Sequence, residues 1–199
     1  AAMSAATGDY IAFLDDDDAW LEGHLRPHLA LFATDPDLDL VIGQVQSVDH
    51  ALQPFGDPWL ADFPATPDDL LRRMLGGYFP QVGSILVRAR VREMVGGFDT
   101  DLPGGEDLDW MLRIAGERRV GFVKTPCVLF THRAIGTFDD LQLSRSRYDR
   151  KVFNRYALRW WRIWRSPAEY MRAYSGTMMH YYRYFVDSAL ERAERGEQR

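Results

Sequence analysis

The sequence predicts an α/β fold, a Rossmann-like mixed sheet flanked by helices, followed by a helical extension. Short apolar segments alternate with amphipathic ones over the first two thirds of the chain, as expected of strands and helices in turn. The last third has only helical periodicity. An apolar content of 46% is ample for a core, and no stretch reaches the length of a membrane-spanning helix.

The first predicted strand is the apolar run at residues 10–14, which ends in four carboxylates, Asp15, Asp16, Asp17 and Asp18. The run is continuously apolar, so we expect both of its faces to be buried, as in a parallel sheet. Ligands of open α/β sheets collect at the carboxyl ends of strands. Four like charges there favour a hard divalent cation such as Mg²⁺ or Mn²⁺. A solvated acidic turn is the alternative.

A second acidic cluster, Glu106, Asp107 and Asp109, opens an amphipathic helix after a glycine-rich loop. Carboxylates in a first turn complement the helix dipole, so helix capping is one explanation. The other is a general base held at a rigid helix start and directed into a cleft. Neither cluster decides between these explanations alone.

Three segments, ATGDYIAFLDDDDAW, VGSILVRARV and GGFDTDLPGGEDLDWMLRI, and more weakly FTHR, resemble the family 2 glycosyltransferases, which have the GT-A fold. The resemblance spans residues 6–133 and implies a GT-A-like sheet. It also implies that Asp15, Asp16 and Asp17 contain a DXD-type motif for a nucleotide-diphosphate sugar and its metal, Mn²⁺ or Mg²⁺. Asp107 would deprotonate the acceptor hydroxyl, and the transfer would invert the anomeric centre in one displacement.

The same resemblance suggests finer roles for individual side chains. Asp17 is the expected direct metal ligand, and Asp15 would help to position the metal or the ribose. His132 is a further candidate ligand, although a lone histidine is more often structural, and Arg133 could offset phosphate charge. The remaining expected substrate-binding residues are Asp16 and Glu106. The acceptor is left open between a glycan, a lipid-linked molecule and a protein.

The family begins with a strand, a loop and a helix that hold the nucleotide base, whereas residues 1–10 resemble the tail of the next helix. We therefore expect an N-terminally incomplete core, and a 199-residue chain that is inactive by itself. Two alternatives stay open. One is a non-catalytic binding or assembly module derived from a glycosyltransferase. The other is another nucleotide-sugar enzyme such as a nucleotidyltransferase.

The other elements follow from periodicity and capping. Thr66 and Pro67 are typical of a helix start. His24 and His28 are interpreted as helix-surface residues. The single cysteine, Cys127, lies in an apolar run and is interpreted as a buried thiol, which favours a cytoplasmic location. The expected helices are 22–32, 67–75 and 88–95; the expected strands are 40–48, 81–87, 120–123 and 127–131; an irregular loop occupies 51–64.

Charge separates the two parts of the chain. Acidic side chains outnumber basic ones about two to one over residues 1–144, and the balance reverses over residues 145–172. We expect a glycosyltransferase core at residues 1–137 and a helical hairpin at residues 138–199, with helices 139–165 and 168–195 separated at Pro167. The mixture of tryptophan and arginine in RWWRIWR suits packing or homodimerisation first, and peripheral contact with the inner face of a membrane second. The acidity elsewhere disfavours nucleic acid.

Overall fold

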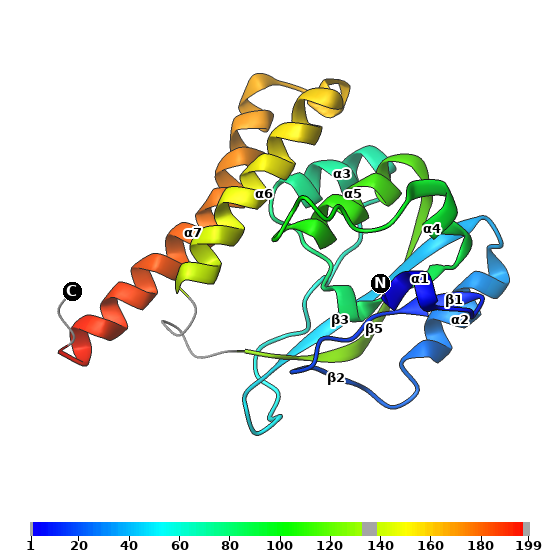
Figure 1. Ribbon diagram of the computed structural model, residues 1–199, viewed down its shortest axis with the longest axis horizontal. Helices are drawn as coiled ribbons and strands as arrows, with labels where there is room; N and C mark the ends of the chain where they lie inside the picture. The colour runs from blue at the N-terminus through cyan, green and yellow to red at the C-terminus, as the bar shows by residue number, and fades with distance from the viewer. Residues whose placement is uncertain (1, 133–138, 197–199) are drawn as a thin grey trace.

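The structure is a computed structural model that describes residues 2–132 and 139–196. Five strands form one mixed sheet in the order β1-β4-β3-β5-β2, and helices cover it (Figure 1). The strands are β1 (Tyr10–Ala12), β2 (Ala19–Trp20), β3 (Leu38–Val48), β4 (Ile85–Arg88) and β5 (Arg119–Thr131). The helices are α1 (Ala2–Ala5), α2 (Leu25–Thr34), α3 (Pro67–Leu75), α4 (Arg90–Val95), α5 (Glu106–Glu117), α6 (Asp139–Arg159) and α7 (Pro167–Glu194). The predicted fold class is confirmed.

The central strand β3 is buried on both faces and separates two layers of helices. Its side chains alternate between the faces. Leu40 and Ile42 belong to the larger core, which α3, α5 and α6 share, whereas Val41 packs with Phe32 of α2 on the opposite side. Strand β5 lies parallel to β3, and β4 lies antiparallel to it. The sheet therefore has helices on both faces, with most of the apolar core on the α5 side.

The structure has a strand within residues 10–14 as predicted, but the expected full burial and parallel pairing are wrong. Strand β1 has three residues and pairs antiparallel with β4 at the end of the described sheet. Of the three, Ile11 alone is buried, and Leu14 beyond the strand is 43% exposed. Tyr10 contributes by packing on Phe32, with ring centroids 5.0 Å apart. The apolar composition of this run reflects contacts on both faces at the edge of the sheet, with Tyr10 and Ala12 on the α2 side and Ile11 and Phe13 on the α5 side.

Two other strand predictions needed correction. The expected strands 120–123 and 127–131 are one strand, β5, because irregular register opposite Gly43 and Gln44 accommodates Pro126 within continuous pairing to β3. The expected strand 81–87 begins only at β4, because Val82–Ser84 form a short 3₁₀ helix. The Gln81 side chain caps that turn by accepting a hydrogen bond from the Gly83 N–H. The first departure comes from pairing between segments, and the second comes from a local side-chain cap.

His28 is buried, so the prediction that it lies on the helix surface is wrong. It is 2% exposed, and its ring nitrogens lie 2.8 Å from the His24 carbonyl oxygen and 3.1 Å from the Ser84 carbonyl oxygen. Gly43 makes room beneath it, because a Cβ there would lie 3.1 Å from the imidazole. Cys127 is buried beside it as predicted, and burial raises the pKa of its thiol to about 12.

Helices α6 and α7 pack side by side as a helical hairpin, and a short 3₁₀ turn joins them (Figure 1). The first helix ends earlier than predicted, because Trp160 leaves helical geometry at φ −106°, ψ 38°. The second begins as predicted, with Ser166 accepting a hydrogen bond from the Glu169 N–H. One face of α6 is buried in the same core as α5; its members are Val152, Phe153, Tyr156 and Ala157, and Trp160 just after the helix joins them. The expected boundary between residues 137 and 138 lies outside the described residues.

Helix α7 also touches the end of α3 through two glycines. A Cβ on Gly176 would lie 2.6 Å from the Gly76 carbonyl oxygen, closer than real contacts allow. The next residue, Thr177, donates its hydroxyl hydrogen bond to the Leu75 carbonyl oxygen. The clash would be with backbone, so a side chain at position 176 requires the helices to separate.

We therefore expect Gly176→Ala to lower the free energy of unfolding by about 1–2 kcal/mol. Overpacking costs about 1–3 kcal/mol, and the higher helix propensity of alanine offsets part of it. Ser175→Ala, at an exposed neighbouring position, is the matched control and should be neutral or slightly stabilising. Urea unfolding of the three proteins tests this; equal stability of Gly176→Ala and wild type would contradict the close approach.

Candidate functional site

The acid turn, residues 15–18, follows β1 after two intervening residues, Phe13 and Leu14. The Asp18 N–H donates to the Asp15 carbonyl oxygen at 3.2 Å and closes the turn. One carboxylate oxygen of Asp18 accepts from the Thr131 N–H at 2.9 Å, and the other accepts from the Gln81 side chain at 2.8 Å. Asp15 and Asp16 are exposed, and Asp17 is half-buried. The carboxylate of Asp18 therefore fixes the turn to β5, while Asp15 and Asp16 are more accessible.

Gln81 is a site residue that the sequence analysis missed. Its side chain is buried, and Nε2 donates to Asp18 and lies 3.2 Å from Asp15 Oδ2. Its oxygen is occupied by the Gly83 N–H, so the amide is fixed in the orientation that offers its donors to the carboxylates. No spacing or composition pattern separates such a glutamine from one at the start of a strand.

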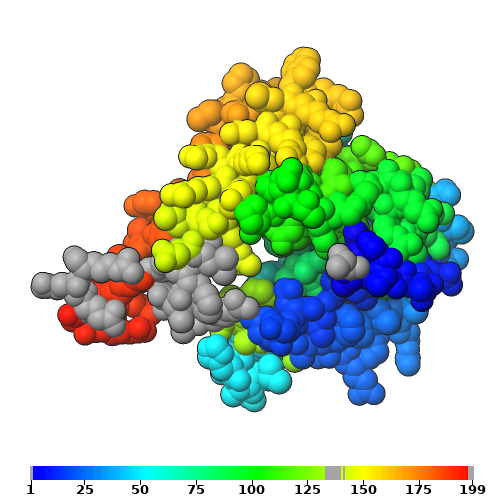
Figure 2. All heavy atoms as spheres, viewed as in Figure 1, coloured from blue at the N-terminus to red at the C-terminus, as the bar shows by residue number. Residues whose placement is uncertain are grey.

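An aromatic cluster brings the two acidic regions to the same side of the sheet. Phe13, two residues before the acid turn, packs edge-on against Trp110 of α5, with ring centroids 5.5 Å apart. Phe98 contacts both, at 5.7 Å from Phe13 and 5.1 Å from Trp110. Figure 2 shows a hollow between the blue segment that holds the acid turn and the green and yellow segments of α5 and α6. The arrangement could receive a ligand between the two carboxylate groups.

Asp107 occupies the first turn of α5, as predicted, and has an unusual pKa. Burial raises it to about 6, and the nearby carboxylates of Glu106 and Asp149 act in the same direction. The Leu108 N–H, which donates to Asp107 Oδ1 at 2.7 Å, and the charge of Arg145 oppose the shift. A carboxylate with a pKa near neutrality is suited to accept a proton under physiological conditions.

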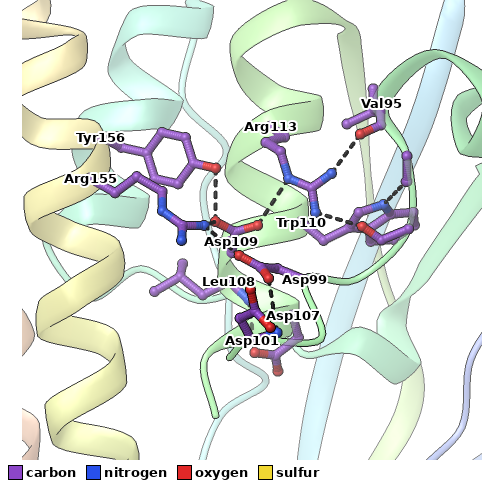
Figure 3. Close-up of polar contacts among 12 residues, drawn as sticks. Val95, Asp99, Asp101, Asp107, Leu108, Asp109, Trp110, Arg113, Arg155 and Tyr156 are labelled. Atoms are coloured by element: carbon purple, nitrogen blue, oxygen red, sulfur yellow. Dashed lines mark hydrogen bonds and ion pairs between the residues drawn. The ribbon is translucent and has the colours of Figure 1, made fainter. Parts of the chain in front are cut away.

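Asp109 has a structural role that differs from capping. It is 1% exposed, and its carboxylate accepts hydrogen bonds from Arg113 at 2.9 Å, Arg155 at 2.7 Å and Tyr156 at 2.8 Å (Figure 3). Arg155 also bonds Asp99, at 2.8 Å, in the loop before α5. The carboxylate of Asp109 therefore joins α5, that loop and α6 in one buried network.

The same network fixes the loop that leads to Asp107. Arg113 donates to the carbonyl oxygens of Val95 and Gly97, and the Trp110 indole donates to the Gly96 carbonyl oxygen at 2.9 Å (Figure 3). These bonds satisfy backbone carbonyls that the turn after α4 leaves without helical partners. The start of α5 is thus held from the loop side and from the α6 side.

His132 follows β5 at the edge of the site. Its backbone N–H donates to the Val48 carbonyl oxygen at 3.0 Å, and its Nε2 lies 3.1 Å from the Ser47 hydroxyl. Phe55 packs on the ring, with centroids 5.1 Å apart, and partial burial lowers the pKa of the imidazole. A neutral imidazole is the form that binds metal. Arg133, the predicted phosphate contact, lies outside the described residues.

Comparison with known proteins identifies the family. Residues 1–86, which include β1, the acid turn and β3, match the model described as glycosyl transferase family 2. These residues belong to glycosyl transferase family 2. The predicted resemblance is thereby confirmed. No curated protein matches the chain.

The fold likeness extends beyond the segment matched to family 2. The crystal structure of S. aureus TarS is similar to this chain at a TM-score of 0.50 and 16% identity, over 78% of this chain and 30% of that chain. At this identity the likeness shows a shared fold, including the predicted GT-A-like arrangement. The chain spans less than a third of the TarS chain.

The resemblance to family 2 glycosyltransferases implies a divalent metal at the acid turn. Within the described ranges, no group of three or more histidine, cysteine, aspartate or glutamate side chains has metal-binding geometry. Magnesium, however, commonly uses one or two carboxylates together with substrate phosphates and water. Asp15 and Asp17 supply hard oxygen donors of that kind, while Asp18 is engaged by Gln81 and Thr131. The residues fit a metal shared with a diphosphate.

Asp107→Asn should change the stability of this chain in a pH-dependent way. The folded state holds the Asp107 proton to about pH 6, whereas an unfolded aspartate releases it near pH 4. The free energy of unfolding therefore falls between these values as pH rises, and ionised Asp107 destabilises the fold above pH 6. Asparagine removes that cost and keeps the oxygen that the Leu108 N–H bonds.

We expect Asp107→Asn to raise the free energy of unfolding by about 1–2 kcal/mol at pH 8, after a reduction for partial exposure, and by much less at pH 4.5. Urea unfolding at the two pH values measures the difference. Asp101→Asn, in the exposed part of the preceding loop, controls for loss of a carboxylate. Equal effects of Asp107→Asn at both pH values would contradict the raised pKa.

Proposed function

We propose that the chain transfers a sugar from a nucleotide-diphosphate sugar to an acceptor hydroxyl, with inversion at the anomeric carbon. The observation that carries this proposal is the position of Asp107, with its pKa near 6, at the start of α5, in a chain whose acid turn lies in the segment matched to family 2. The aromatic contact of Phe13 with Trp110 supports a single site built from both. The acceptor class stays open between a glycan, a lipid-linked molecule and a protein.

Asp107 would take the proton of the acceptor hydroxyl while that oxygen attacks the anomeric carbon and the nucleoside diphosphate leaves. Its helix-start position and hydrogen bond to Leu108 limit its motion, which favours in-line geometry. The donor would contact Asp15, Asp16 and Glu106. A bound Mn²⁺ or Mg²⁺, held by Asp17 and Asp15 with His132 as a further candidate, would offset the charge of the diphosphate. The proposed site therefore has two parts: residues that would bind the nucleotide-sugar donor and its metal, and Asp107 as the general base.

The family match disfavours a nucleotidyltransferase, whereas a non-catalytic module derived from the family stays an alternative that turnover would decide. None of the described helices is long and apolar enough to cross a membrane. The cytoplasmic location stays a prediction, as do homodimerisation and membrane contact through the hairpin. The exposed side chains of Leu158, Trp161 and Met171 support a contact surface there.

Transfer should depend on Asp107 in the complete gene product that contains these 199 residues. Loss of a positioned general base typically lowers turnover by about 10²–10⁴-fold, and we expect Asp107→Asn to fall in this range with donor affinity nearly unchanged. A panel of uridine, guanosine and thymidine diphosphate sugars with manganese identifies the donor, and calorimetry then measures its affinity. Substantial turnover by Asp107→Asn would place the base elsewhere; no turnover by the wild type with any donor and acceptor would favour the non-catalytic module.

Divalent metal should bind weakly at the acid turn and more tightly with a nucleoside diphosphate. We expect Asp17→Asn to weaken Mn²⁺ binding by about tenfold or more, because the ion loses one of few charged ligands. Calorimetric titration of the 199-residue chain with Mn²⁺, alone and with uridine diphosphate, measures this. Asp101→Asn is the control for general charge; binding to Asp17→Asn as tight as to wild type would exclude Asp17 as a ligand.

A further inference from the structure

The hairpin presents ionisable groups to the start of α5. Asp149 of α6 lies against Gly105, the residue before the first turn of α5: a Cβ on Gly105 would lie 2.6 Å from Asp149 Oδ1 and 3.6 Å from its backbone nitrogen. Gly105 has φ +71°, a conformation in which other residues are strained. No side chain other than hydrogen therefore fits between Asp149 and the turn that carries Asp107.

Tyr181 of α7 holds Asp149 in this position. Its hydroxyl donates a hydrogen bond to Asp149 Oδ2, and its side chain is 7% exposed. Burial raises the pKa of Asp149, whereas the bond from Tyr181 and the charges of Arg145 and His180 lower it. Burial and the neighbouring Asp149 also raise the pKa of Tyr181, which keeps its proton available for the bond. The Asp149 carboxylate of α6 is thus held by a hydrogen bond from Tyr181 of α7.

Several charges face Asp107 from the elements packed around it. On α5 these are Glu106 and the Leu108 N–H; on α6 they are Asp149 and Arg145; on α7, Tyr181 interacts electrostatically with Asp107. Asp149 and Glu106 disfavour the ionised form of Asp107, and Arg145 favours it. The two α6 residues act with opposite sign and lie one helical turn apart, so their effects can be separated by mutation.

We propose that Asp149, fixed by Tyr181, is a positioning residue for Asp107, and that it contributes to the charge environment of this candidate base from the helical hairpin. The proposal rests on the function proposed above, in which Asp107 takes the acceptor proton. The hairpin is then part of the catalytic apparatus: it contacts the Gly105 turn and adjusts the proton affinity of the base. Burial is the main cause that raises the pKa of Asp107, and the nearby carboxylate of Asp149 adds to it in the same direction.

Two substitutions on α6 test the proposal in opposite directions. Asp149→Asn preserves the shape and an oxygen acceptor for Tyr181, and should lower the titration midpoint of Asp107 by about half a pH unit. Arg145→Gln removes an exposed cation and should raise the midpoint. Asp187→Asn, on the exposed face of α7, removes a charge without contacting the site and should leave the midpoint unchanged. The exposed Arg145 position keeps the test available if Asp149→Asn fails to fold.

The midpoint is read by carbon-13 NMR of the side-chain carboxylates, with the Asp107 signal assigned by its absence in Asp107→Asn. This measurement needs no turnover, so it separates this proposal from the proposed function. The acidic limb of kcat/KM against pH should move with the NMR midpoint in each variant. An unchanged Asp107 midpoint in folded Asp149→Asn, or in Arg145→Gln, would overturn the proposal. Shifted midpoints without turnover in any variant would support the coupling and contradict the transferase function.

Discussion

The buried carboxylate of Asp109 is the interaction on which the arrangement of the site depends. A charge that is 1% exposed is costly unless it is fully paired, and here two arginines and a tyrosine pair with it. Those partners come from α5 itself and from α6. Removing one partner of such a buried pair typically costs about 3–5 kcal/mol, because the remaining charge stays buried. The hairpin and the α/β part are therefore joined electrostatically as well as by apolar packing.

This constraint determines where Asp107 can be. Arg113 and Trp110 hold the loop before α5 through its backbone carbonyls, and Arg155 holds the same loop through Asp99. Asp107 lies between that fixed loop and the fixed helix, with the Leu108 N–H on its carboxylate. A base that must meet an acceptor hydroxyl in line with a leaving group benefits from such restricted motion.

In each acidic cluster, one carboxylate has several hydrogen-bond partners that join distant segments. In the acid turn, Asp18 bonds Gln81 and the Thr131 N–H, whereas Asp15 and Asp16 are exposed. At the start of α5, Asp109 is fully engaged, whereas Asp107 has a pKa near neutrality because burial and neighbouring carboxylates act on it. Neighbouring acidic residues in the sequence therefore have different environments in the structure, because their hydrogen-bond partners come from distant segments.

The sequence by itself determined the elements whose signals lie in adjacent residues of the chain. The apolar run of β3, the Thr66 cap and Pro67 at the start of α3, and the amphipathic start of α5 are local signals, and the structure has these elements where they were expected. The family was also readable, because its motifs are contiguous. Only the tertiary structure decided the edge position of β1 and the burial of His28. The same is true of the hydrogen bond from Gln81 to Asp18 and of the contact of Asp149 with Gly105. Each of these depends on pairing between segments far apart in the chain, and a side chain's burial and charge partners are set by that pairing rather than by its own neighbours in sequence.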